Sequence, residues 1–89
     1  MAKVEIYISI MCPYCSRAIK LLRSKNISFQ QIDVSMNGEL RQIMQSRAGG
    51  HKSVPQIFID DEHIGGCDEL IALDSAGHLD DLLNRSALK

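Results

Sequence analysis

The sequence predicts a single α/β domain over residues 1–89, in which helices flank both faces of a four-stranded mixed sheet. Three observations support this fold class. The length of 89 residues suits one domain. Short runs rich in β-branched residues alternate with stretches of helical apolar periodicity. Gly, Asn and Asp mark the turns between them, and the expected order is βαβαββα followed by a last turn of helix.

The first half of the chain predicts a βαβ unit. Val4–Ile8 (VEIYI) is rich in β-branched residues and is expected to be a central strand. Asn26 can adopt the left-handed conformation that ends a helix, and residues 27–34 predict a second strand. A strand, a helix and a strand joined by short links form a right-handed unit with parallel strands. The apolar stripe of the expected helix consists of Cys15, Ala18, Ile19 and Leu22.

The second half predicts a helix, a hairpin and two further helical segments. Asn37 can cap the second helix through its side chain, and the acidic turn at residues 60–62 separates two short strands. The expected elements are a second helix between Asn37 and Gly49, strands at 55–59 and 63–65, a third helix from near Asp68 to Gly77, and a short last helix around Leu79, Leu82 and Leu83.

The composition excludes several classes of partner. The net charge is −1, and no basic tract is dense enough to predict nucleic-acid binding. No apolar run approaches the roughly 18 residues that would predict a membrane span. The start, MAKVEIYI, lacks the apolar core of a secretory signal, so we expect a cytoplasmic protein without a membrane partner.

Cys12 and Cys15, in the stretch CPYC, carry the predicted chemistry. Cys12 is expected at the N-cap of the first helix and Pro13 at its first position, where the missing N–H costs nothing. The free N–H groups of Tyr14 and Cys15 can point at the Cys12 sulfur, and with the helix dipole they favour a thiolate. We therefore expect an exposed nucleophile at Cys12 and a buried resolving thiol at Cys15.

Two other uses of a C-x-x-C pair are less consistent with the chain. A disulfide staple across two residues would restrict the unfolded chain little, and a count of three cysteines is odd. Zinc requires four ligands, and no second C-x-x-C or histidine pair follows. His51, His63 and His78 are scattered singly and are read as surface or packing residues. A C-x-x-C beside a βαβ unit instead indicates a thioredoxin-like redox site.

Three motifs resemble glutaredoxin, most closely the bacterial dithiol type: CPYC at 12–15, SVPQIFID at 53–60 and GGCDEL at 65–70. The similarity covers nearly the whole chain. The resemblance implies a thioredoxin-like fold and an enzyme, a glutathione-dependent thiol–disulfide oxidoreductase. It implies that a Cys12–Cys15 dithiol/disulfide couple reduces protein–glutathione mixed disulfides and protein disulfides. Glutathione is then the reductant and co-substrate, and no metal is expected.

The resemblance also implies a glutathione site. Pro55 matches the family's cis-proline, and the backbone of Val54 would pair with the cysteinyl unit of glutathione. Without the resemblance, a trans proline and an ordinary Gly-Gly turn would be expected. Asp68 can pair with the ammonium group of the ligand, and a helix N-terminus suits its carboxylate. The residues assigned to glutathione binding are Tyr14, Arg47, Val54, Pro55, Gly66, Cys67 and Asp68.

Two features of the predicted site are left open. Many glutaredoxins have Lys or Arg where this chain has Ser9, so Arg17, Arg47, His51 or Lys52 are candidates to replace the missing cation. The third cysteine, Cys67, is either a small semi-buried residue or a secondary site of oxidation. Tyr14 is similarly either a wall of the groove or a helix-surface aromatic.

The resemblance suggests partners and leaves two alternative functions. Expected partners are glutathione, glutathionylated or disulfide-bonded proteins, with ribonucleotide reductase as a family-level candidate, and indirectly the glutathione reductase system. We expect a monomer. One alternative is a glutathione-ligated iron–sulfur cluster carrier, which Pro13 and the second cysteine disfavour. Another is a redoxin reduced by a flavoprotein, against which the GGCD loop argues.

Overall fold

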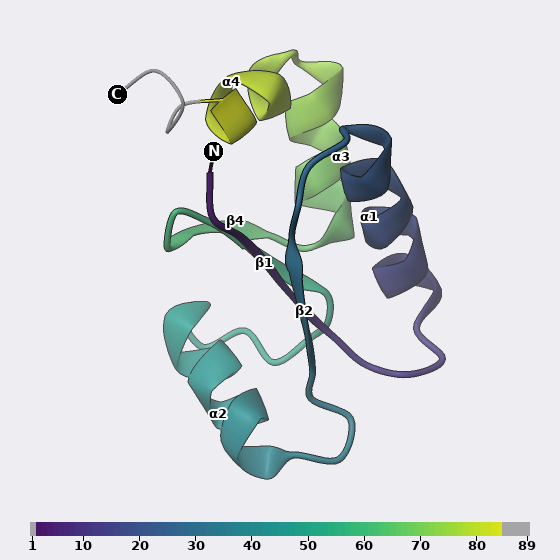
Figure 1. Cartoon of the computed structure of the whole chain (residues 1–89). Helices are drawn as coiled ribbons and strands as arrows, with labels where there is room; N and C mark the ends of the chain where they lie inside the picture. The colour runs from purple at the N-terminus through teal and green to yellow at the C-terminus, as the bar shows by residue number, and fades with distance from the viewer. Residues whose placement is uncertain (1, 85–89) are drawn as a thin grey trace.

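The structure, a computed structural model, describes residues 2–84 and contains a mixed sheet with helices on both faces (Figure 1). Residue 1 and residues 85–89, which the predicted domain includes, lie outside the described part. No helix within residues 2–84 combines the length and the apolar character needed to cross a bilayer. The elements are β1 (Val4–Ile8), α1 (Pro13–Ser24), β2 (Gln30–Asp33), α2 (Gly38–Arg47), β3 (Gln56–Ile59), β4 (Glu62–Gly65), α3 (Cys67–Ser75) and α4 (His78–Asn84).

The sheet has the strand order β2-β1-β3-β4, so β1 is an inner strand as predicted. β1 pairs in parallel with β2 and antiparallel with β3, and β3 pairs antiparallel with β4. The parallel pair confirms the predicted βαβ unit, and the β3–β4 pair confirms the hairpin. The turn of this hairpin contains Asp60 and Asp61, both with positive φ, a conformation that Asp tolerates better than most residues.

Alternation along β1 and β3 supplies two separate hydrophobic cores. Because successive strand side chains point to opposite faces, each strand feeds both cores. The larger core, against α1, α3 and α4, contains Val4, Ile6, Ala18, Leu22, Ile57, Ile59, Cys67, Leu70, Leu79 and Leu83. The smaller core, against α2, contains Tyr7, Val34, Met44, Ala48 and Phe58. In Figure 1 the helices α1 and α3 lie on one side of the sheet and α2 on the other.

The helix ends agree closely with the predicted signals. Two elements, β2 and the last helix, differ in length from the prediction. Asn26 has φ 56° after α1, and Asn37 Oδ1 accepts a 3.0 Å hydrogen bond from the Leu40 amide at the start of α2. β2 is shorter than predicted and begins at Gln30. α3 begins at Cys67, within one residue of the predicted start near Asp68, and Gly66 is its N-cap. The last helix, α4, runs over seven residues and exceeds one turn.

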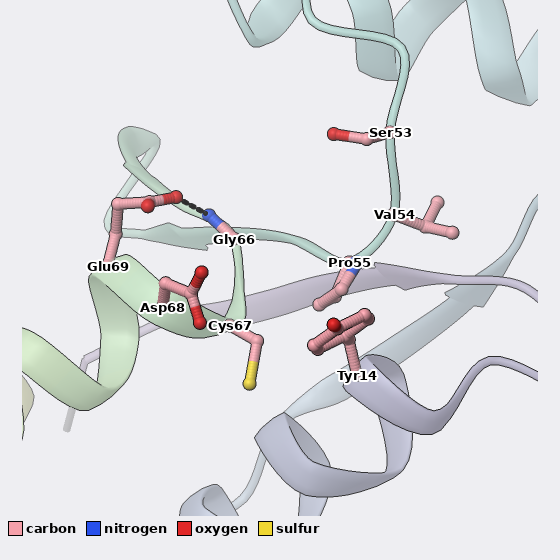
Figure 2. Close-up of a pocket in the computed structure, with 8 residues that line it drawn as sticks. All are labelled: Tyr14, Ser53, Val54, Pro55, Gly66, Cys67, Asp68 and Glu69. Atoms are coloured by element: carbon pink, nitrogen blue, oxygen red, sulfur yellow. Dashed lines mark hydrogen bonds between the residues drawn. The ribbon is translucent and has the colours of Figure 1, made fainter.

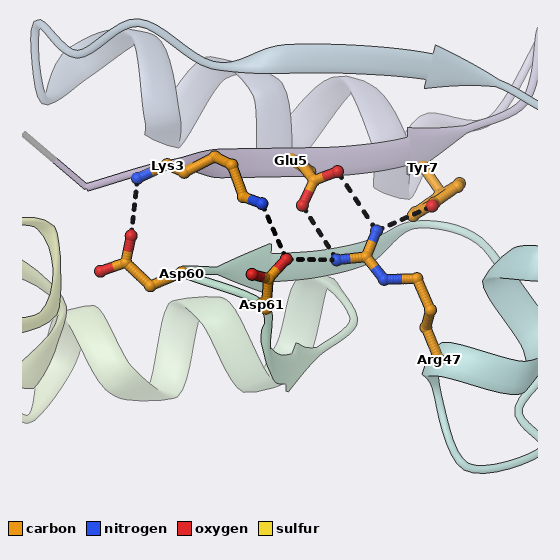
Figure 3. A network of polar contacts seen from close by, with 6 residues as sticks. All are labelled: Lys3, Glu5, Tyr7, Arg47, Asp60 and Asp61. Carbon is orange, nitrogen blue, oxygen red and sulfur yellow. Dashed lines mark hydrogen bonds and ion pairs between the residues drawn. The ribbon is translucent and has the colours of Figure 1, made fainter.

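A polar network built on Arg47 fastens the end of α2 to the sheet (Figure 3). Its guanidinium forms two hydrogen bonds with the Glu5 carboxylate, at 2.9 and 3.2 Å, and one with Tyr7 Oη at 2.8 Å. It also approaches Asp61 at 3.4 Å and lies 4.1 Å from the centroid of the Phe58 ring. The hydrogen bonds to Glu5, above all, raise the pKa of Arg47. Four segments of the chain are therefore joined through one side chain.

Replacing Arg47 with methionine is expected to lower the free energy of unfolding by about 2 kcal/mol. The Glu5 side chain is only 13% exposed and would lose its charged partner. Urea denaturation measures the change. Arg23→Met is the matched control, because Arg23 is exposed on α1, and it should shift stability by less than about 0.5 kcal/mol. Equal losses in the two variants would contradict this account of the network.

Candidate active site

Cys12 occupies the N-cap of α1, where β1 has ended and the helix begins. Its backbone is extended, with φ −109° and ψ 106°, and Pro13 follows at the first helical position. The Cys15 amide donates a hydrogen bond to Cys12 Sγ at 3.3 Å. A helix N-terminus stabilises negative charge near it, and Cys12 at this one is partly exposed.

Cys15 lies one turn further on and is 3% exposed. Burial, together with the hydrogen bond to Cys12, raises the pKa of Cys15 to about 12. At neutral pH Cys15 is therefore a protonated thiol held beside a more accessible one. The three cysteines, Cys12, Cys15 and Cys67, carry free thiols in this structure.

A cleft of about 240 Å³ lies where α1, the segment before β3 and the start of α3 meet (Figure 2). In Figure 2 the Tyr14 ring lies beside Pro55, and the Cys67 sulfur and the Asp68 carboxylate lie across the cleft from the Ser53–Val54 segment. The cleft is lined by Tyr14, Ser53, Val54, Pro55, Gly66, Cys67, Asp68 and Glu69. Tyr14 therefore forms one of its walls, although its side chain is also 56% exposed.

The Val54–Pro55 peptide bond is cis, which agrees with the family-based expectation. This segment is tied to the nucleophile, because the Cys12 thiol donates to the Val54 carbonyl at 3.8 Å. It also abuts the start of α3: a Cβ atom on Gly66 would stand 3.3 Å from the Pro55 carbonyl oxygen. Glycine permits this close approach of two backbone segments.

Acidic side chains gather at the N-terminus of α3. Glu69 Oε1 accepts a 2.7 Å hydrogen bond from the Gly66 amide, and Asp68 leaves its carboxylate in the cleft. Glu69 was missed by the sequence analysis, although its position three residues after the N-cap is the usual place for such a side chain. Cys67 is 4% exposed, and burial raises its pKa. The low exposure favours the structural reading of Cys67 over that of a freely accessible thiol.

Gln56 connects the cleft to β4 through a chain of hydrogen bonds that the sequence analysis also missed. Its side chain is 3% exposed and donates to the Ser53 carbonyl at 3.0 Å and to Ser53 Oγ at 3.3 Å. Because the amide nitrogen faces Ser53, the amide oxygen faces His63 Nε2, at 2.6 Å. His63 therefore carries its proton on Nε2. Its ring also packs against Phe58, with centroids 5.1 Å apart.

The structure brings six of the seven residues assigned to glutathione binding to one cleft and leaves Arg47 out of it. Arg47 is engaged with Glu5, on the face of the sheet that α2 covers, and does not line the cleft. Two other cations lie nearer. Arg41 Nη1 donates to the Lys52 carbonyl at 3.1 Å, and the Arg17 guanidinium lies 5.8 Å from the centroid of the Tyr14 ring.

The comparisons with known proteins agree with one another. The glutaredoxin family model matches residues 4–64. Glutaredoxin 3 of Escherichia coli strain K12 is 55% identical over 83 residues, which cover 93% of this chain and 99% of that protein. A solution structure of glutaredoxin from Brucella melitensis superposes with a TM-score of 0.82 at 51% identity, covering 93% of this chain and 89% of the other. A crystal structure of a buckwheat glutaredoxin–glutathione complex gives a TM-score of 0.85 at 26% identity, covering 94% and 78%.

Alkylation of the native protein with iodoacetamide is expected to modify Cys12 and to spare Cys15 and Cys67. With a pKa of about 12, Cys15 holds only about one thiolate in ten thousand at pH 8, and it is also buried. Peptide mapping by mass spectrometry measures the labelling. Unfolding in urea is the control and should expose all three thiols. Comparable labelling of Cys12 and Cys15 in the native protein would show that burial does not separate them.

Gln56→Leu is expected to weaken binding at the cleft, because the Ser53 carbonyl loses its donor and His63 its acceptor. KM for a disulfide substrate should rise about three- to tenfold, with kcat changed less than about twofold. Steady-state kinetics separates the two constants. Gln31→Leu makes the same change at an exposed position of β2 and should leave both constants as they are. A fall in kcat at constant KM would argue against a role of Gln56 in positioning the cleft.

Proposed function

The chain belongs to the glutaredoxin family, whose members are thiol–disulfide oxidoreductases, and on that basis we propose that its reductant is glutathione. The observation that carries the proposal is the position of Cys12 Sγ. This sulfur lies within 3.8 Å of the Val54 carbonyl, so the nucleophile borders the cleft that six of the expected ligand-binding residues line. The buckwheat relative was crystallised as a complex with glutathione, which supports a tripeptide ligand here.

In the proposed complex, glutathione lies along the segment before β3. The backbone of Val54 pairs with its cysteinyl unit, and Pro55 and Tyr14 form the apolar wall. At the other end, the γ-glutamyl carboxylate meets the N-terminus of α3 at the Cys67 amide, because the Gly66 amide already donates to Glu69. Asp68 pairs with the ammonium group. Oriented in this way, the glutathione sulfur reaches Cys12.

The glycine carboxylate of glutathione needs a cation, and the chain has Ser9 where the family often has Lys or Arg. Arg47 is an unfavourable candidate, because its guanidinium already pairs with Glu5. Lys52 and His51 precede Ser53 on an exposed loop, and Arg41 holds that loop through the Lys52 carbonyl. We therefore assign this role to the loop at residues 51–52, supported by Arg41.

Reduction of a glutathionylated protein proceeds in two exchanges. The Cys12 thiolate attacks the glutathione sulfur, the protein–glutathione S–S bond breaks, and the protein leaves as a thiolate that takes up a proton. Cys12 then carries glutathione. The thiolate of a second glutathione attacks the bound glutathione sulfur, and glutathione disulfide leaves while the Cys12 thiolate is regenerated.

Reduction of a protein disulfide uses Cys15 as well. Cys12 attacks one substrate sulfur and forms a mixed disulfide. Cys15 then loses its proton and attacks the Cys12 sulfur, which releases the reduced protein and leaves a Cys12–Cys15 disulfide. Two glutathione molecules reduce this disulfide and leave as glutathione disulfide. The high pKa of Cys15 keeps this thiol unreactive until a mixed disulfide forms beside it.

The proposal extends to the setting of the reaction. A glutathione pool maintained by glutathione reductase supplies the electrons, which suits a cytoplasmic monomer acting on glutathionylated or disulfide-bonded proteins such as ribonucleotide reductase. The iron–sulfur carrier is not favoured, because Cys15 beside Cys12 provides the second thiol of a redox couple.

Two serine variants test the proposal in a glutathione-coupled assay. Cys12→Ser is expected to lose activity at least about a thousandfold on all substrates, because no nucleophile remains. Cys15→Ser should reduce small glutathione mixed disulfides within about threefold of the wild-type rate and should fail on protein disulfides. Thioredoxin reductase in place of glutathione is the control for a glutathione-independent redoxin. Faster turnover with that enzyme would overturn the proposal.

A further inference from the structure

Three large apolar side chains are exposed on the loops that follow β1 and β2. Met11 directly precedes Cys12 and is 97% exposed, Ile10 is 63% exposed, and Met36 is 94% exposed. We call these three residues the apolar rim. The glutathione chemistry proposed above uses none of them. Ile10 and Met11 leave apolar surface in water beside the nucleophile that follows them in the chain.

Hydrogen bonds hold the rim in place. The Ile10 amide donates to Ser35 Oγ at 2.8 Å, and Ser9 Oγ lies 3.1 Å from the same hydroxyl. Ser35 is in turn bound to Asp33 Oδ1 through its amide at 2.8 Å and its hydroxyl at 2.6 Å. The loops that follow β1 and β2 are thereby joined, which places Met36 next in the chain to the residue that holds Ile10. Met11 itself has φ 57°, an uncommon conformation for a side chain of this kind.

Two members of the rim, Ile10 and Met11, line a second hollow of about 530 Å³, which also includes Cys12 and Cys15 and shares no residue with the glutathione cleft. Apart from Cys12, which reacts as a thiolate, none of its lining residues carries a charge. A carboxylate that entered this hollow would lose water and face that thiolate, and an ammonium group would lose water for this single partner, whereas an apolar side chain would gain contacts. The hollow is lined by Ser9, Ile10, Met11, Cys12, Pro13, Cys15 and Ser16.

We propose that this hollow selects protein disulfides in which a large apolar residue neighbours the attacked cysteine. The inference rests on the proposed function, because exchange at Cys12 requires two sulfur atoms to reach bonding distance. The residues beside the substrate cysteine must then lie on the surface around Cys12. The glutathione cleft lies on one side of the Cys12 sulfur, and the hollow lies on another side. Methionine suits this role, because its flexible thioether adapts to different apolar partners.

The test uses three disulfide-containing peptides that differ only in the residue after the attacked cysteine, which is Leu, Glu or Lys. The wild-type protein should reduce the Leu peptide with a kcat/KM about tenfold above that of either charged peptide. In the double variant Ile10→Thr/Met11→Asn this preference should fall to about twofold. Both replacements are uncharged, and Asn accepts the positive φ at position 11.

Two controls separate this inference from the proposed function. Ile43→Gln removes an apolar side chain that is 50% exposed on α2, and it should keep the tenfold preference. The double variant should reduce a small glutathione mixed disulfide at the wild-type rate. Failure of the wild-type protein itself to reduce this disulfide would refute the proposed function and would leave the test of the rim unaffected. Equal rates for the Leu and Glu peptides, a preference for Lys alone, or an undiminished preference in the double variant would overturn the role of the rim.

Discussion

The hydrogen bond from the Cys15 amide to Cys12 Sγ is the interaction on which the site depends. It exists because β1 ends before Cys12 and α1 begins after it, so the Cys15 N–H in the first turn of the helix is free to donate to that sulfur. The two hydrophobic cores serve this arrangement. Ile6 anchors the strand on one face and Tyr7 on the other, while Ala18 and Leu22 hold the helix against the sheet. The position of the nucleophile is thus set by the packing of the elements that precede and follow it.

The cleft is assembled from segments far apart in sequence, and backbone contacts join them. Val54 approaches the nucleophile, Pro55 abuts Gly66, and Gln56 turns its amide back to Ser53. Each of these contacts involves the short segment before β3, so its position determines the shape of the cleft.

Most of the fold followed from local signals in the sequence, and most of the site followed from three motifs. The caps at Asn26 and Asn37 were visible because their chemistry is local. The position of Arg47 could not be predicted from local signals, because helical periodicity does not show which end of α2 reaches the cleft. Arg41, near the other end of that helix, bonds the loop before Ser53 instead. The assignment of Arg47 came from matching positions in a family, and the long-range partner Glu5 could not be read from that match.

The Gln56–His63 contact escaped prediction for a related reason. A glutamine inside PQIFI reads as an interruption of an apolar strand, and its partner depends on the register of β3 and β4. That register shifts between Ile57 and Phe58, so residue spacing alone would have paired the strands incorrectly. Glu69 was overlooked because the helix was expected to start near Asp68, whereas Gly66 is the cap.

The contact between the Cys12 thiol and the Val54 carbonyl couples two events at the site. A thiol can donate to this oxygen, whereas a thiolate has no hydrogen to give. Loss of the thiol proton therefore removes this donor from the Val54 carbonyl oxygen, and the amide of an incoming ligand can donate to the oxygen in its place. Ionisation of the attacking sulfur thus changes the hydrogen-bonding capacity of the peptide group beside it.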